Sequence, residues 1–405
     1  MKVLRRHSLT GGDVSYRQGY HWAIRSFIPI PFSIRPGPQE RMATIAISLC
    51  GEGRGHATRI ATLIEHLERR HDIRVYSSDD GYRFLQQRFA VGHPRVSVHE
   101  IPGIVFQYSG GRLDVPRSIR AGLDYQARQL GPLVDQMMAD LETFNVSLAI
   151  TDFEPALPRA VARQGVPLLS IDHQHFLLAY ELDALPWTLR WNAWLMSHAV
   201  WMYVSGAAET VVSAFFRPPL RRGWEHVKQV GPLLRREITQ AVPSDGGYVL
   251  SYLRRHTPFR AVETLARCGL PVKVYGLGAR DPIGSLSFQP IDDRQFAADL
   301  AGCRAVVSAA GNQLIGEAIH LGKPLLVLPE RAHGEQSMNS HFLRFMGCGD
   351  FVHLEDVTVG DICRFLEGVD RYAVPLANLA GTMDGTPRVL EIIQHWLSQR
   401  LSDAA

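Results

Sequence analysis

The sequence predicts an α/β protein with two doubly wound domains of similar size, each built around a parallel β-sheet. From Met42 onward, short apolar runs alternate with longer amphipathic segments, as expected of successive βαβ units. The alternation stops at residues 216–237, which are rich in proline, glycine and charge, and starts again near Gly247. At 405 residues the chain is too long for one compact core. We therefore expect two sheets that face each other across a cleft.

The first domain is predicted to occupy residues 42–225. Its strand candidates are the apolar runs at residues 44–50, 73–78, 146–151 and 167–172. Apolar residues at helical spacing predict helices at residues 60–70 and 155–164.

The second domain is predicted to occupy residues 226–385. Its strand candidates are residues 248–253, 271–277, 286–290, 304–310, 324–330 and 351–354. Helices are expected between them, for example at residues 259–268 and 293–303. A separate C-terminal helix is expected within residues 386–405. In doubly wound sheets, ligands bind at the carboxyl ends of the strands, so the cleft between the two sheets is the expected site.

The first 41 residues differ from the rest of the chain in charge. They hold seven Lys/Arg and two Asp/Glu residues, whereas the remaining 364 residues hold 36 and 38. The net charge of +3 therefore comes from this segment, and the nearly neutral remainder predicts no nucleic-acid partner. Its apolar run, residues 23–34, is interrupted by Arg25, Pro29 and Pro31 and suits neither a signal peptide nor a membrane span. We expect this N-terminal extension, residues 1–41, to be disordered or untranslated, with Met42 as the natural start.

The five cysteines are scattered without the spacing of a zinc site or a disulfide framework, which favours a reducing cytosol. Residues 185–204 hold four of the seven tryptophans, and the apolar part of this segment is too short to span a bilayer. The segment is either a core or interface helix, or a surface for a hydrophobic acceptor or a membrane. We expect a cytoplasmic protein and leave peripheral contact with the inner face of the membrane open.

The segment CGEGRGH, residues 50–56, connects the first predicted strand to the first predicted helix. Gly53 and Gly55 permit a tight turn and close approach of a ligand to backbone N–H groups at the helix N-terminus. His56 stands where a dinucleotide-binding fingerprint has its last glycine, and the lysine of a Walker motif is missing. At a helix N-terminus the dipole favours a neutral imidazole, which can accept a proton near pH 7. The loop is either a plain strand–helix turn or a ligand-facing turn with His56 as a candidate base.

Two carboxylates, Asp152 and Glu154, follow the strand candidate at residues 146–151. They should lie on the same sheet edge as the first loop, where a carboxylate beside His56 would fix its tautomer. Asp152 is therefore a candidate catalytic partner, and its alternative role is to cap the following helix. His173 and His175 follow the next strand and, with Glu154, are candidates to line an acceptor site. A metal site would need more ligands than this spacing supplies, so we expect none.

The segment at residues 304–322 reads as a strand, a turn of small residues and a helix. Ala310, Gly311 and Asn312 expose backbone N–H groups at the start of the helix, which suits a diphosphate. Glu317 lies further along the same helix, where its carboxylate could accept hydrogen bonds from a ribose. A solvated helix carboxylate is the alternative interpretation of Glu317.

After the next predicted strand, a second group of polar side chains begins another helix. Its members are Glu335, Gln336 and Asn339. Fixed donors and acceptors of this kind suit the hydroxyl groups of a sugar, and a helix-capping cluster is the alternative. Together with the preceding turn, the cluster suggests a pocket for a ligand that carries a ribose, phosphates and several hydroxyls.

These residues resemble the donor-binding region of glycosyltransferases with the GT-B fold. The segments SAAGNQLIGEA, GKPLLVLP and GEQSMN are similar to those of the lipid II N-acetylglucosaminyltransferase and of the plant-type UDP-sugar transferases. GEGRGHATR resembles the first-loop signature of an uncharacterised microbial group of related transferases. The resemblance implies two Rossmann-like domains, with the acceptor held by residues 42–225 and the nucleotide-sugar by residues 226–385.

The resemblance also implies the reaction, an inverting and metal-independent transfer from a nucleotide-sugar, with no other cofactor. A hexose or N-acetylhexosamine would move from a UDP-sugar to a hydroxyl of a small-molecule, polysaccharide or lipid-linked acceptor. His56 would deprotonate the acceptor with the support of Asp152. The residues implied to contact the donor, from diphosphate through ribose to sugar, are Gly311, Asn312, Glu317, Glu335 and Gln336.

Two departures from the family pattern bear on this prediction. The plant-type transferases have Asp-Gln where this chain has Glu335-Gln336, which leaves the identity of the sugar open. The turn at residues 309–312 lacks their phosphate-contacting histidine, so backbone N–H groups would have to hold more of the diphosphate. Three other functions stay open: a nucleotide-sugar 2-epimerase, a dinucleotide-dependent oxidoreductase using Asp79 or Asp80, and a non-catalytic sugar-nucleotide sensor.

Overall fold

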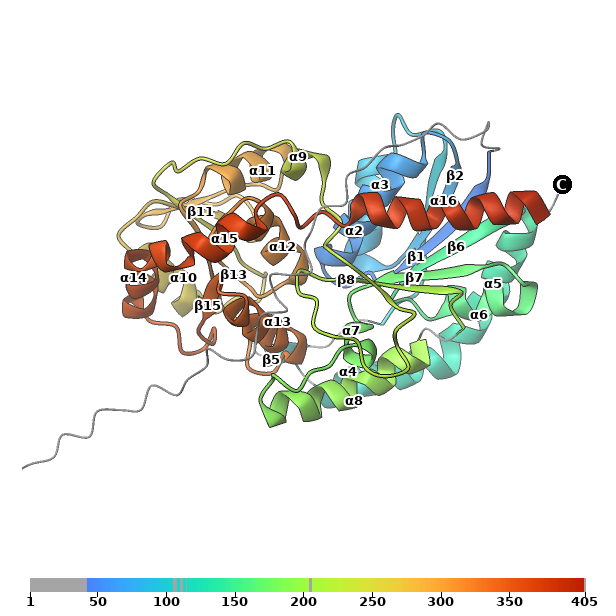
Figure 1. Ribbon diagram of the computed structural model, residues 1–405, viewed down its shortest axis with the longest axis horizontal. Coiled ribbons are helices and arrows are strands. Elements are labelled where there is room, and N and C mark those ends of the chain that lie inside the picture. The colour runs from blue at the N-terminus through green and yellow to red at the C-terminus, as the bar shows by residue number, and fades with distance from the viewer. Residues whose placement is uncertain (1–41, 105–107, 110–111, 114, 204–205, 404–405) are drawn as a thin grey trace, which may run out of the picture.

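The computed structural model describes residues 42–403 apart from residues 105–107, 110–111, 114 and 204–205. The extension at residues 1–41, and the prediction made for it, lie outside this range. Figure 1 shows two α/β bodies side by side, each with helices packed around a central sheet. The sheets have seven and six strands within the described part of the chain, and every pairing in them is parallel. The predicted fold class, two doubly wound parallel sheets, is confirmed.

The first sheet is assembled around its two central strands, β1 and β6. Its strands are β1 (Thr44–Leu49), β2 (Asp72–Ser77), β3 (Val96–Glu100), β6 (Val146–Asp152), β7 (Leu168–Asp172), β8 (Glu209–Ser213) and β9 (Lys228–Val230). The spatial order is β3-β2-β1-β6-β7-β8-β9, so the chain reverses its direction of growth between β1 and β6. This reversal creates a crevice at the carboxyl ends of β1 and β6, which is where doubly wound sheets bind ligands.

Helices cover both faces of the first sheet. They are α2 (Arg54–Leu67), α3 (Asp79–Phe89), α4 (Val115–Asp124), α5 (Leu130–Thr143), α6 (Ala156–Gln164), α7 (Phe176–Ala179) and α8 (Trp187–Tyr203). A π-helical turn, Tyr125–Gln129, joins α4 to α5, and a short hairpin, β4 (Tyr108–Ser109) with β5 (Arg112–Leu113), precedes them. The helix that matters most for the site is α2. Its apolar residues Ile60, Leu63, Ile64 and Leu67 recur at helical spacing and are buried in the core beneath the sheet.

The second sheet repeats this plan with six strands. They are β10 (Val249–Tyr252), β11 (Val272–Tyr275), β12 (Leu286–Phe288), β13 (Ala305–Ser308), β14 (Leu325–Val327) and β15 (Gly349–Phe351), in the spatial order β12-β11-β10-β13-β14-β15. The covering helices are α10 (Phe259–Ala266), α11 (Asp293–Gly302), α12 (Asn312–His320), α13 (Gly334–Phe345), α14 (Val359–Glu367) and α15 (Ala373–Leu379), with a 3-10 turn, Val369–Tyr372, before the last. The crevice of this sheet lies between β10 and β13, beside the N-terminus of α12.

The last helix, α16 (Thr386–Asp403), leaves the second sheet and returns to the first. Figure 1 shows it lying across the first body. Its Val389, Ile393 and Leu397 are buried in the same core as Ile45 of β1. At the other connection, β9 pairs with β8, so the first sheet continues slightly beyond the boundary predicted after residue 225. The chain therefore crosses between the two bodies twice, once through short helix α9 (Arg236–Thr239) and once before α16.

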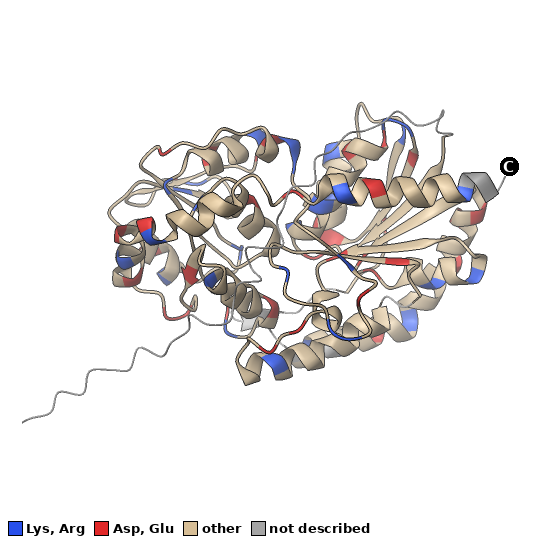
Figure 2. Cartoon of the chain, in the orientation of Figure 1, with Lys and Arg blue, Asp and Glu red and all other residues tan. Residues whose placement is uncertain are grey.

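The two bodies share apolar and charged contacts. The ring of Phe216, which follows β8, stacks on Phe342 of α13 with centroids 3.9 Å apart. Arg88 of α3 forms an ion pair with Asp293 of α11 on the other body. Gly334 at the start of α13 packs so closely on α8 that an added Cβ would collide with Asn192. Figure 2 shows basic and acidic residues interspersed on the helices of both bodies.

Candidate active site between the two sheets

The centre of the candidate site is a pair formed by His56 and Asp152. Asp152 is the last residue of β6 and pairs in register with Leu49 at the end of β1, so it lies in the crevice of the first sheet. His56 lies in the first turn of α2, and its Nδ1 is 2.8 Å from Asp152 Oδ1. The Asp152 side chain is fully buried, whereas that of His56 is 13% exposed. An ionised carboxylate only accepts hydrogen bonds, so Nδ1 carries the proton and Nε2 keeps a lone pair.

A third member of this cluster, Arg59, was not identified from the sequence. Its Nη1 donates to both Oδ1 and Oδ2 of Asp152, each at 2.8 Å, and its side chain is 3% exposed. Arg59 lies three residues after His56, and side chains at this spacing share one face of a helix. The signal was therefore present in GEGRGHATR, as an arginine on the helix face that carries the candidate base.

Gln174 approaches His56 from the other side of its ring. Gln174 follows β7, and its Nε2 is 3.4 Å from His56 Nε2. An amide N–H directed at Nε2 fits the tautomer with its proton on Nδ1. Gln174 was also missed by the sequence analysis, although it stands between the two histidines that were selected.

The first loop meets the conditions for close approach of a ligand. Gly53 has a φ of 78°, a conformation that favours glycine, and it precedes α2. A Cβ added to Gly53 or Gly55 would have no neighbour within 4 Å, so both face open space. Gly51 is different, because an added Cβ would collide with Ser78 and displace the loop from the neighbouring strand end.

His173 links the first sheet to α13 of the second. Its Nε2 lies 3.3 Å from Asn339 Oδ1 and 3.9 Å from Glu335 Oε1, and its Nδ1 lies 3.3 Å from the Ser213 carbonyl. Burial lowers the pKa of His173, which favours its neutral form. Burial would raise the pKa of Glu335, but its electrostatic interactions with His173, His333, His56 and Arg59 outweigh burial and lower that pKa. The carboxylate of Glu335 therefore lies, ionised, beside the groups of the first sheet.

Glu154 and His175, both predicted to line an acceptor site, are engaged in local contacts instead. The two carboxylate oxygens of Glu154 accept hydrogen bonds from the backbone N–H groups of Ala156 and Leu157, at the start of α6. His175 Nδ1 is 2.6 Å from Asp172 Oδ2, and both side chains are almost fully buried. These contacts are those of a helix cap for Glu154 and of a buried ion pair for His175.

At the turn before α12 the helix N-terminus is exposed, whereas the side chain of Asn312 is hydrogen-bonded within the protein. Gly311 is exposed and precedes α12, where the first N–H groups have no partner within the helix. The Ala310 carbonyl accepts a hydrogen bond from Asn339 Nδ2 at 3.0 Å. Asn312 is 5% exposed and bonds to Ser213 O and Phe215 N of the other body. The Gly311 N–H itself bonds to the Ala309 carbonyl, so the donors left for an anion are the first N–H groups of α12, while the Asn312 side chain holds the two bodies together.

Glu317 and Gln336, the other predicted donor contacts, are buried and hydrogen-bonded within the protein. Glu317 is 2% exposed and accepts from Arg235 at 2.9 Å and Gln313 at 3.2 Å. Gln336 Oε1 accepts from the backbone N–H of Glu330 at 3.0 Å. A donor that contacted Glu317 would therefore compete with an existing buried ion pair. Glu335, whose side chain is 23% exposed, is the most accessible carboxylate of the predicted donor set.

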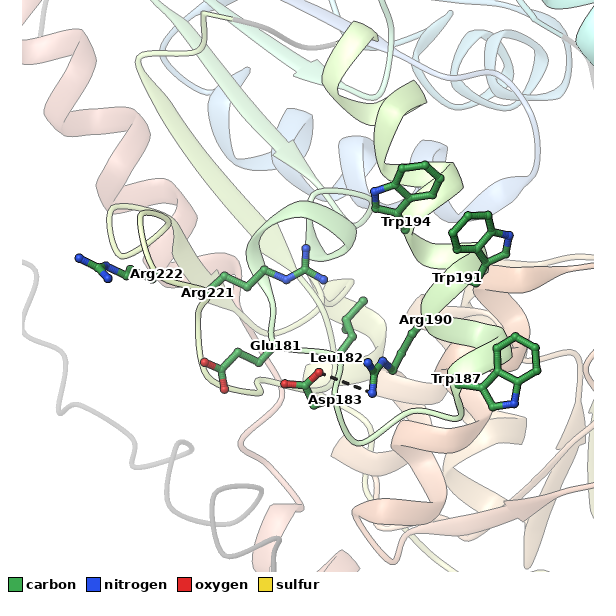
Figure 3. Close-up of a pocket in the computed structure, with 9 residues that line it drawn as sticks. All are labelled: Glu181, Leu182, Asp183, Trp187, Arg190, Trp191, Trp194, Arg221 and Arg222. Atoms are coloured by element: carbon green, nitrogen blue, oxygen red, sulfur yellow. Dashed lines mark ion pairs between the residues drawn. The ribbon is translucent and has the colours of Figure 1, made fainter.

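The tryptophan-rich segment forms α8 and lines a surface cavity of about 700 Å³. The cavity is bordered by Glu181, Leu182, Asp183, Trp187, Arg190, Trp191, Trp194, Arg221 and Arg222. Figure 3 shows the three tryptophans along one side of α8, with Arg190 and Arg221 nearby. None of the helices in the described ranges is long and apolar enough to cross a bilayer. Likewise, the described residues contain no cluster of three or more His, Cys, Asp or Glu side chains suited to a metal ion.

Two facing parallel sheets, with a histidine–aspartate pair on one and exposed helix N-termini on the other, are the features of a GT-B glycosyltransferase. The family profile described as glycosyl transferase family 1 matches residues 43–370. This chain therefore belongs to glycosyl transferase family 1 and is a glycosyltransferase. It is similar to an uncharacterized glycosyltransferase of Methanosarcina mazei, with 24% identity over 402 residues that cover 88% of this chain and all of the relative.

Solved structures confirm the GT-B fold at low sequence identity. UGT89C1 of Arabidopsis thaliana complexed with UDP-L-rhamnose matches with a TM-score of 0.63 and 14% identity, over 90% of this chain and 100% of that one. LpCGTa in complex with UDP matches with a TM-score of 0.61 and 15% identity, over 88% and 100%. MurG of Acinetobacter baumannii matches with a TM-score of 0.54 and 14% identity, over 87% and 99%. At these identities the likeness shows the fold, and the residue roles must be argued from this chain.

Proposed function

We propose that this protein transfers a hexose or N-acetylhexosamine from a UDP-sugar to an acceptor hydroxyl, with inversion at the anomeric carbon. The observation that carries the proposal is the His56–Asp152 pair at the carboxyl ends of β1 and β6, beside Glu335 of the second body. UDP and UDP-L-rhamnose, named with two of the matching structures, support a uridine donor.

The proposed reaction proceeds in one displacement. His56 Nε2 takes the proton of the acceptor hydroxyl while the oxygen attacks the anomeric carbon from the face opposite the diphosphate. The bond from that carbon to the diphosphate oxygen breaks, and the nucleoside diphosphate leaves with the electron pair. Asp152 holds the His56 ring and stabilises the imidazolium that forms. Without such a base, the hydroxyl would have to lose its proton to water after attack, which is slower.

Backbone groups are proposed to hold the leaving diphosphate. The first turn of α12, which follows exposed Gly311, offers N–H groups that have no partner within the helix, together with the positive end of the helix dipole. Because these donors are part of the backbone, we propose that the protein needs no obligatory metal ion. Turnover should be the same with EDTA and with added Mg²⁺, and loss of turnover in EDTA that Mg²⁺ restores would contradict this part of the proposal.

The donor can be tested by thermal denaturation of the full chain with UDP-, GDP-, CDP- and dTDP-sugars and with NAD(P). A ligand at about 100 times its Kd should stabilise the fold by roughly 2.7 kcal/mol. We expect a UDP-sugar to raise the melting temperature and NAD(P) to leave it unchanged. Stabilisation by NAD(P) alone would indicate an oxidoreductase. Incubation with UDP-N-acetylglucosamine and no acceptor is the control for epimerase activity, because an epimerase would convert the donor unaided.

We propose that the exposed face of α8 contacts an anionic lipid surface, from which a lipid-linked acceptor could reach the cleft. Trp187, Trp191, Trp194 and Trp201 recur at helical spacing and are 51–76% exposed. Tryptophan favours the membrane–water interface, and arginines at the adjacent cavity can pair with lipid phosphates. The opposite face of α8 packs on α13 close to Glu335, which connects this surface to the candidate site.

Vesicle binding tests this surface. The full chain should sediment with phosphatidylglycerol vesicles and less with phosphatidylcholine vesicles. A variant with Trp187, Trp191 and Trp194 replaced by serine should lose this binding, while Phe259→Ser, which removes a 61% exposed aromatic from α10, should keep it. No sedimentation of the wild type would contradict the proposal. A concentration-dependent dimer that the triple variant abolishes would identify a second copy of the chain as the partner instead.

A further inference from the structure

We infer that Arg59 is a positioning residue of the proposed reaction. Its guanidinium holds the Asp152 carboxylate in place as an acceptor aimed at His56, and so sets the tautomer of His56, with the proton on Nδ1 and the lone pair on Nε2. The inference rests on the proposed role of His56 as the base, and it assigns a function to a residue that contacts neither donor nor acceptor in that proposal.

The geometry places all three groups on one carboxylate. Asp152 Oδ1 is 2.8 Å from His56 Nδ1 and also 2.8 Å from Arg59 Nη1, which reaches Oδ2 at 2.8 Å as well. His56 and Arg59 project from the same face of α2, and Asp152 comes from the end of β6. Helix α2 therefore carries both His56 and Arg59, and both side chains bind Asp152.

The chemistry of the carboxylate explains why a cation is needed there. Asp152 is fully buried, and a buried carboxylate without a cation tends to take up a proton. A protonated Asp152 could donate to the imidazole instead of accepting from it, and His56 would no longer be held with its proton on Nδ1. Arginine stays protonated at any working pH, so Arg59 keeps Asp152 an acceptor throughout.

A purely structural ion pair is the alternative, and two observations favour the positioning role. The Nε of Arg59 is buried and has no hydrogen-bond partner among the described residues, so the guanidinium bonds to Asp152 while its Nε–H is left unpaired. In addition, the charge of Arg59 contributes to lowering the pKa values of His173 and Glu335. Arg59 thus acts electrostatically on the whole candidate site.

Removal of Arg59 has a predictable direction. The groups that contact or act on the His56–Asp152 pair include Arg59 on α2, Gln174 after β7 and Glu335 on α13. Of these, Arg59 donates to both carboxylate oxygens of Asp152. Loss of these two bonds should leave Asp152 less firmly aimed at His56, so the fraction of neutral His56 with its proton on Nδ1 should fall.

The test is long-range ¹H–¹⁵N NMR of the full chain with ¹⁵N-labelled histidine. The His56 signals are identified by their absence in His56→Gln. The wild type should show a proton on Nδ1 of neutral His56. In Arg59→Gln the fraction of neutral His56 with its proton on Nδ1 should fall, and Arg59→Lys, which keeps the charge, should restore most of the wild-type distribution. Arg74→Gln, which removes from β2 the half-buried partner of Asp140, is the matched control and should leave the tautomer of His56 unchanged.

An unchanged tautomer in Arg59→Gln would overturn the inference, as would a wild-type His56 protonated on Nε2. If Arg59→Gln does not fold, the wild-type tautomer decides the question: a proton on Nδ1 supports the inference and a proton on Nε2 overturns it. These readouts need no substrate, so they are independent of the proposed function. Normal turnover of a UDP-sugar by His56→Ala would remove the proposed base while leaving the effect of Arg59 on the pair measurable.

Discussion

Two histidine–aspartate pairs lie on neighbouring strand ends of the first sheet, and they differ in which parts of the chain bond to the aspartate. In each, the aspartate is the last residue of a strand, Asp152 of β6 and Asp172 of β7. Their carboxylate oxygens lie 2.8 Å from His56 Nδ1 and 2.6 Å from His175 Nδ1. The residue types, the sheet edge and the distances are therefore nearly the same.

The two pairs differ in the distance along the sequence between the aspartate and the residues that bond to it. Asp172 accepts hydrogen bonds from the His175 backbone N–H and the Ser170 hydroxyl, so its partners all come from one short stretch of chain. Asp152 joins His56 and Arg59, which lie more than ninety residues earlier in the sequence, and leaves His56 Nε2 beside the amide of Gln174. A local pair stabilises the turn that contains it, whereas a long-range pair can orient a base toward a cleft.

The largest expected effect separates the two histidines by turnover. His56→Ala should reduce turnover of a UDP-sugar by about 10²–10⁴-fold, the usual range for the loss of a general base. His175→Ala is the matched control: it removes the same side chain from the same sheet edge and should affect stability more than rate. The measurement is steady-state turnover together with the melting temperature of each variant. If His56→Ala and His175→Ala both fold and lose the same amount of turnover, the two pairs do not differ in function as proposed.

A second prediction extends the comparison to the other body, where the carboxylate of Glu317, like that of Asp172, is buried and hydrogen-bonded within the protein. Glu317→Gln keeps the shape of the side chain but leaves buried Arg235 with only Asp293 as an ion-pair partner. We expect a loss of about 3 kcal/mol in the free energy of unfolding, at the lower end of the range for a broken buried pair. Urea denaturation measures it.

Arg163→Gln serves as the control for that measurement, because it removes an exposed pair with Asp135 and should cost at most about 1 kcal/mol. The Kd for UDP-glucose should be measured on the same Glu317→Gln protein. Unchanged stability with weaker donor binding would show that Glu317 serves the ribose rather than the fold.

The sequence predicted the sheets well because buried parallel strands are continuous apolar runs, as in β1, β6 and β13. It missed β3, which is partly exposed and polar, β8, which is a mostly buried strand of five residues, and β9, which has three residues. It also placed the candidate residues at the correct sheet edge, since topology fixes where the carboxyl ends of strands lie.

What the sequence could not predict is which of those side chains already have partners. Asn312 bonds to Ser213, 99 residues earlier, and Glu317 bonds to Arg235, 82 residues earlier. Neither partner has a spacing or motif that marks it. Arg59 is the opposite case, since its position relative to His56 was visible in the sequence but its target, Asp152, is a contact between a helix and a distant strand.

The smallest predicted effect concerns the pH dependence of the local pair. Burial alone would raise the pKa of Asp172, but the charge of His175 and the hydrogen bonds from His175 and Ser170 outweigh it and lower that pKa to about 2, from the usual 3.8. The unfolded chain therefore takes up this proton first as the pH falls. The contribution of Asp172, about 2 kcal/mol, should be complete above about pH 4 and should be lost progressively toward pH 2.

Asp172→Asn removes this titration, so the comparison of variant and wild type isolates the pair. The free energy of unfolding should fall more steeply between pH 4 and pH 2 in the wild type than in Asp172→Asn, which urea titrations across that range can measure. His175 adds a second pH dependence of stability, with the opposite direction. Burial would lower its pKa, but Asp172 outweighs burial and raises it, so its contribution is present below the unfolded value of 6.5 and is lost as the pH rises through the folded value. Parallel curves for the two proteins would mean that the pair adds nothing to stability, and His175 would then have to be reconsidered as a residue of the site.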